Sequence, residues 1–85
     1  RRSIDFVIDP TDVPPDDLVL ISLFSSLLTK LGELIQEVGD EQARIQIVSQ
    51  LFPGARFNAS GRYFEIRLAE IAESFQNALR IAQAA

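Results

Sequence analysis

The sequence predicts an α+β fold in a single small domain, residues 1–85, and two kinds of periodicity support that prediction. Near the N-terminus apolar and polar residues alternate, which is the period of a strand with one buried face. Farther on, apolar residues recur at steps of three and four in two long segments, which is the period of an amphipathic helix. The expected architecture is an N-terminal strand and a hairpin packed against these two helices. An all-α bundle with an N-terminal arm is the alternative, because the hairpin segment also fits helical spacing.

The first expected element is a strand over residues 3–9. Its apolar face consists of Ile4, Phe6 and Ile8. Pro10 ends the strand, because proline cannot donate to a β-ladder. In the proline-rich connector that follows, Thr11 or Asp12 is expected to cap the next helix.

The longest periodic segment is residues 16–39, which we expect to form one helix. Its apolar seam advances by four and three residues, as in helices that pack on other helices, and consists of Leu20, Phe24, Leu27, Leu31, Leu34 and Val38. A second row widens the seam with Ile21, Leu28 and Ile35. Gly39 is expected to end the helix in a left-handed conformation. Residues 18–29 contain no charge, so small polar side chains stand opposite the seam, where charges are usual.

Residues 40–52 fit either a helix or a strand. A helix would be capped by Asp40, whereas a strand would alternate around Ile45 and Ile47. Periodicity alone does not decide between these interpretations for so short an apolar run. Pro53 and Gly54 end the element in either case.

A hairpin is expected over residues 56–68, with residues 58–61 as its turn. Its second strand alternates apolar and polar side chains. Helical spacing overlaps this strand from Phe64 onward, so the last helix is expected to begin anywhere from Gly61 to Ala69. Its alanine-rich C-terminal end is expected to fray.

The composition argues against an enzyme, a cofactor and a metal site. The chain has no His and no Cys, so it lacks the usual ligands of transition metals, the commonest general base and the best nucleophile. No glycine-rich phosphate-binding motif is present. The acidic group of Asp9, Asp12, Asp16 and Asp17 lacks the glycine and the closing glutamate of an EF-hand loop. Strand-end and helix-cap roles are the preferred interpretation of these four aspartates.

Charge and hydropathy limit the classes of partner that this chain is expected to bind. The net charge of −4 argues against nucleic acid and against an anionic membrane surface. No run approaches the roughly 20 apolar residues of a membrane span. The absence of Cys and of a visible signal peptide predicts a cytoplasmic protein. Residues 1–43 sum to 3 − 9 = −6 and residues 44–85 to 5 − 3 = +2, a division that favours attraction between copies unless it arises by chance.

Two groups of residues are candidates for a protein interface. Small side chains on the first helix would let another helix approach closely, and they are Ser22, Ser25, Ser26 and Thr29. Basic and aromatic side chains around the hairpin would meet an acidic patch on a partner, and they are Arg56, Arg62, Tyr63 and Arg67. A solvated surface is the alternative for each group.

These observations predict a non-enzymatic protein-interaction module that self-associates or acts as an adaptor. Its partner would be a second copy or another protein domain. The alternative function is a small regulatory inhibitor that binds and blocks a bacterial enzyme, with the aspartates of residues 9–17 imitating nucleic-acid charge.

Overall fold

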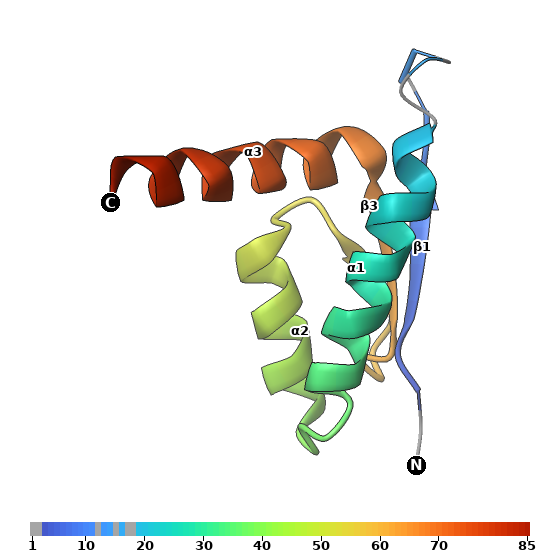
Figure 1. Ribbon diagram of the computed structural model, residues 1–85. Helices are drawn as coiled ribbons and strands as arrows, with labels where there is room; N and C mark the ends of the chain where they lie inside the picture. The colour runs from blue at the N-terminus through green and yellow to red at the C-terminus, as the bar shows by residue number, and fades with distance from the viewer. Residues whose placement is uncertain (1–2, 12, 15, 17–18) are drawn as a thin grey trace.

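Three helices and a mixed sheet make up the part of the chain that this computed structural model describes, residues 3–11, 13–14, 16 and 19–85. The elements, in order, are β1 (Asp5–Asp9), α1 (Leu20–Ile35), α2 (Glu41–Leu51), β2 (Arg56–Phe57), β3 (Tyr63–Arg67) and α3 (Leu68–Ala84). The strand order is β1-β3-β2, with β1 parallel and β2 antiparallel to the central strand. Figure 1 shows α1 lying along β1, and α3 extending away toward the C-terminus. The α+β prediction is confirmed, and the all-α alternative is wrong.

One face of the sheet is buried and the other is open, as the alternation of the strands predicts. The register aligns Phe6, Phe64 and Phe57 in one row across the buried face. The ring centroids of Phe6 and Phe64 are 5.4 Å apart, and those of Phe57 and Phe64 are 6.5 Å apart. Phe64 and Ile66 of the central strand are fully buried. The N-terminal strand and the hairpin therefore form one sheet, with β3 between them.

α1 begins later than the expected helix. Its first residue is Leu20, and the preceding Val19 makes no side-chain cap. Thr11 does not cap it either, because the Thr11 amide and hydroxyl both donate to the Asp9 carboxylate. Asp12, the other expected cap, lies outside the described residues.

The end of α1 also differs from the expectation. The helix ends at Ile35, and Gly39 does not adopt a left-handed conformation, so the predicted glycine stop is wrong. The Val38 amide instead donates to the Ile35 carbonyl over 3.0 Å. The next helix follows at once, since the Asp40 carboxylate accepts from the Ala43 amide at 2.9 Å. That cap resolves the ambiguity of residues 40–52 in favour of a helix.

The apolar face of α1 is wider than the part of it that the rest of the chain covers. The buried residues are Phe24, Leu28, Gly32 and Ile35. In contrast, Leu23, Leu27 and Leu34 are 51%, 42% and 75% exposed. The buried face of α1 is thus centred on the row of Leu28 and Ile35, beside the predicted seam, because the row of Leu28 and Ile35 faces β1. Leu27 and Leu34, expected in the core, remain largely at the surface.

α3 begins at Leu68, directly after β3 and within the range that the sequence allowed. Its first turns are fixed to the α2–β2 connection. The Glu70 carboxylate accepts from the Gly54 amide at 2.8 Å, and the Ser74 hydroxyl donates to the Leu51 carbonyl at 3.0 Å. From Phe75 onward every residue of the helix is exposed. We call residues 75–84 the α3 arm.

Arg44 is a buried cation in the first turn of α2, with only 2% of its surface exposed. Its Nε donates to the Gly61 carbonyl at 3.0 Å. Its two terminal nitrogens donate to the carbonyls of Val38 and Ser60, each at 2.5 Å. One guanidinium thus joins α2 to the loop before it and to the hairpin turn.

Replacing Gly61 by alanine is expected to lower the free energy of unfolding by about 2 kcal/mol or more. Gly61 has φ +65°, and a Cβ there would lie 2.8 Å from the Glu41 carbonyl oxygen. Gly39→Ala is the matched control, because no atom lies within 4 Å of its Cβ position. We expect that variant to change stability by less than about 0.5 kcal/mol. Urea denaturation followed by circular dichroism measures both, and equal losses would contradict the geometry of the turn.

Candidate protein-interaction surface

The small residues predicted as an interface lie at the surface of α1. Two of them, Ser25 and Thr29, lie on the side of the helix that borders β1. Ser22, Ser25, Ser26 and Thr29 are all exposed. The Thr29 hydroxyl donates to the Ser25 carbonyl at 2.9 Å, within the helix. Together with Gly32, these residues form a stripe of small side chains along α1. Gly32 is buried, and a Cβ there would lie 3.4 Å from the Ile4 Cβ. At Gly32, the N-terminal strand of the same chain makes the close approach that a small residue permits.

The second predicted group gathers on the open face of the sheet. The strand register places Arg56 opposite Glu65, Arg67 opposite Asp9 and Tyr63 opposite Asp5. The fourth residue, Arg62, precedes β3, and its carbonyl accepts from the Asp5 amide at 2.8 Å. Three of the four residues thus share one face, with Arg62 at its border.

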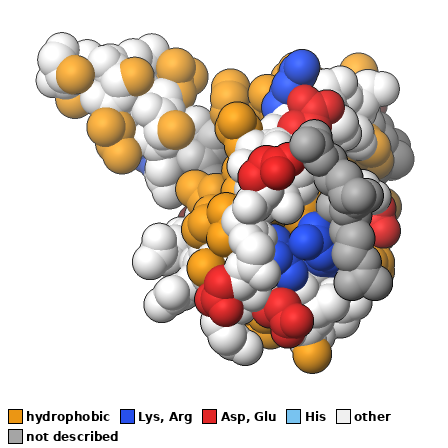
Figure 2. All heavy atoms as spheres, turned by 90° about the horizontal axis from the view of Figure 1, so that it is seen from below, with side chains coloured by type: hydrophobic (Ala, Val, Ile, Leu, Met, Phe, Trp, Pro, Cys, Tyr) orange, Lys and Arg blue, Asp and Glu red, His pale blue; other side chains and the backbone are white. Residues whose placement is uncertain are grey.

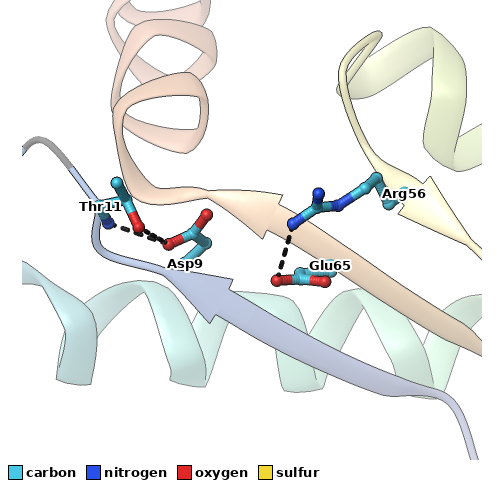
Figure 3. Close-up of polar contacts among 4 residues, drawn as sticks. All are labelled: Asp9, Thr11, Arg56 and Glu65. Carbon is cyan, nitrogen blue, oxygen red and sulfur yellow. Dashed lines mark hydrogen bonds and ion pairs between the residues drawn. The ribbon is translucent and has the colours of Figure 1, made fainter.

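Carboxylates balance the guanidinium groups on this open face. Arg56 Nη2 lies 3.0 Å from Glu65 Oε2. Figure 3 marks this ion pair with a dashed line. The Thr11 hydroxyl, and then the Thr11 amide, donate to Asp9 and lower the pKa of that carboxyl; Arg56 and Arg67 lower it less. A cleft of about 320 Å³ lies among these charged side chains and Gly54. Because both signs of charge are interspersed, the face lacks the net positive potential that would attract an acidic partner.

The four aspartates that were compared with an EF-hand calcium loop are only partly described by the structure. Asp12 and Asp17 lie outside the described residues, and Asp9 is held by Thr11. Within the described ranges, no three His, Cys, Asp or Glu side chains are grouped so that they could hold a metal ion. No helix among the residues placed by the structure is long and apolar enough to cross a membrane.

An apolar groove between α1 and α3 is the surface that the sequence prediction missed. The α1–α3 groove has a volume of about 220 Å³, and its lining includes Phe24, Leu27, Leu31, Phe52, Phe75 and Ala78. Phe24 and Phe75 meet edge to face at its base, with ring centroids 6.2 Å apart. The sequence signal was present, since the apolar arc of α1 is broad and the four-three spacing of α3 continues to Ala82.

The α3 arm continues this apolar surface into solvent. Phe75 and Leu79 are 49% and 50% exposed, and they lie one helical turn apart. Figure 2 shows the arm projecting from the body, with apolar side chains along it. Arg80 is the one charged residue in the sequence from 74 to 85, and it donates to the Asn77 side chain. The arm is therefore an almost uncharged amphipathic helix with its apolar face uncovered.

Comparison with protein-family models, with curated proteins and with solved structures gives no match to this chain. A proposal for its function therefore depends on the sequence and on the geometry described above.

Proposed function

We propose that this chain is a non-enzymatic protein-interaction module that docks another protein chain on the α1–α3 groove and the α3 arm. The supporting observation is the unbroken apolar face of α3. It runs from the buried Leu68 and Ile71 to the exposed Phe75 and Leu79. A helix that packs only within its own chain normally turns polar where its cover ends. An uncovered apolar face beside a groove is typical of a surface that binds a partner.

The shape of the chain agrees with this proposal. Its radius of gyration is 13.2 Å, whereas a compact domain of this length has a radius of gyration of about 12 Å. The α3 arm, which projects from the rest of the chain, contributes to this difference (Figure 1). Extending a helix away from its own core leaves apolar area in water, at a cost of about 25 cal/mol for each Å². A partner that covers the arm would remove that cost.

A photo-cross-linking phenylalanine derivative at position 79 is expected to form covalent adducts with another protein chain in the cells that make this protein. The matched control carries the same derivative at Asn77, which lies on the opposite side of the helix from Leu79 and Phe75. We expect adducts at position 79 to exceed those at position 77 by about tenfold, because proximity governs the yield. Adduct yield is measured by gel electrophoresis and mass spectrometry. Absent adducts, or equal yields at the two positions, would refute the proposed surface.

A further inference from the structure

We infer that the partner is a second copy of this chain, in a two-fold dimer in which each α3 arm packs into the α1–α3 groove of the other copy. This inference rests on the proposed function and names its partner.

The surface left uncovered matches what one half of a dimer interface buries. The chain exposes 5810 Å² at a mass of 9.5 kDa. A compact monomer of that mass exposes about 5,050 Å². The excess is roughly 750 Å², and each partner in a standard interface buries about 800 Å². A single partner of ordinary interface size would therefore account for the excess.

The spacing of the exposed apolar residues indicates that the partner presents a helix. On α3, the exposed Phe75, Ala78 and Ala82 advance by three and then four residues. On α1, the partly exposed Leu27, Leu31 and Leu34 advance by four and then three residues. A mean step of 3.5 residues keeps a seam aligned along a second helix that crosses at a shallow angle. The two seams meet at the groove, which Leu27 and Leu31 line from one side and Phe75 and Ala78 from the other.

A second copy supplies a helix of the required kind. The α3 arm alternates the large Phe75 and Leu79 with the small Ala78 and Ala82, which suits interdigitation in a narrow groove. In a two-fold interface the same patch appears on both sides, so each copy provides an arm and a groove. Both contacts form together, and no exposed arm is left over.

Charge does not oppose this contact, although each copy has a net charge of −4. Among the residues that the structure describes, no charged side chain lines the α1–α3 groove. Arg80 is the one charged residue of the arm, and it lies away from the line through Phe75 and Leu79. Two copies can therefore meet here without burying like charges, which would be costly.

The test is the mass of the purified full chain in solution, measured by sedimentation equilibrium from micromolar to millimolar concentration. We expect a dimer of about 19 kDa, twice the 9.5 kDa of one chain. Leu79→Glu is expected to remain at the monomer mass throughout, because it would bury a carboxylate in the groove. Asn77→Glu adds the same charge to the other side of the arm and should remain a dimer. Circular dichroism of each variant verifies that the fold is retained.

A mixture of two variants tests the exchange of arms. Leu27→Glu damages the groove but leaves the arm intact, whereas Leu79→Glu does the reverse. Each variant alone should be a monomer. Mixed together, they should form a weaker heterodimer, because one intact arm still meets one intact groove. A mixture that remains monomeric would overturn the exchange.

The remaining outcomes separate this inference from the function on which it rests. A wild-type chain that is monomeric at every concentration overturns the dimer. If position 79 still forms adducts with a different protein, the interaction module stands and the partner is not a second copy. If position 79 forms no adducts, the proposed function fails as well. A dimer that persists in Leu79→Glu also overturns the inference.

Discussion

Replacing Arg44 by methionine is expected to lower the free energy of unfolding by about 3 kcal/mol or more. Methionine fills much of the same space but donates no hydrogen bond. It would leave the carbonyls of Gly61, Val38 and Ser60 without their present donor. Each carbonyl left unsatisfied and buried costs about 1–3 kcal/mol. A chain of 85 residues has a total stability of roughly 4–13 kcal/mol, so the loss is a large part of the whole.

Urea denaturation followed by circular dichroism measures this loss against two controls. Arg56→Met removes an arginine whose side chain is 71% exposed and paired with Glu65, and we expect a change below about 1 kcal/mol. Arg44→Lys should fall between the two, because one ammonium group does not reach three carbonyls in three directions. Equal losses in Arg44→Met and Arg56→Met would show that the buried contacts contribute nothing to stability.

Replacing Phe64 by alanine is expected to lower the free energy of unfolding by about 3–5 kcal/mol. Phe64 is fully buried in the central strand of the sheet. Its ring lies between those of Phe6 and Phe57. Alanine would lose the burial of the ring and both ring contacts, and would leave a cavity where strands and helices meet.

Phe57→Ala is the matched control, because Phe57 lies in the same row of rings but is 48% exposed. We expect it to cost about 1 kcal/mol, since half of its surface is already in water. Phe64→Leu keeps most of the buried volume and should cost less than Phe64→Ala. The same denaturation measurement ranks the three variants. A loss in Phe64→Ala no greater than that in Phe57→Ala would contradict the placement of the core.

Local patterns predicted the strands well and the helix boundaries less well. The period of two located β1 and β3 because each strand has one buried face. The expected ends of α1 were wrong. Thr11 donates to Asp9 and does not cap the helix, and the chain turns after Ile35 without a left-handed Gly39. The helix of residues 40–52 has a local cap at Asp40, and Arg44 of that helix also contacts Gly61, far along the chain. No local pattern contains such a contact.

The sequence carried a signal for the candidate surface, the broad apolar arc of α1, but did not show which part of that arc is left uncovered. Leu27 and Leu34 have the spacing of core residues, and spacing does not reveal which row of a broad apolar arc is covered. That depends on where β1 lies, and β1 rests against Gly32 of α1. The row of Leu28 and Ile35 is therefore buried, and the row of Leu27 and Leu34 is left at the surface.

The parallel pairing of β1 with β3 has a consequence for the order in which this chain folds. Asp5 pairs with Tyr63, which is 63 − 5 = 58 positions later in the sequence. Closing a loop of that length costs on the order of 3–4 kcal/mol of chain entropy before contacts between the two strands can offset it. The ribosome makes β1 before β2 and β3, yet β1 has no neighbouring strand in this sheet until β3 has emerged. Of the three strands of this sheet, the one that is synthesised first is therefore among the last to be placed, and folding should be slower than in a helical chain of similar length.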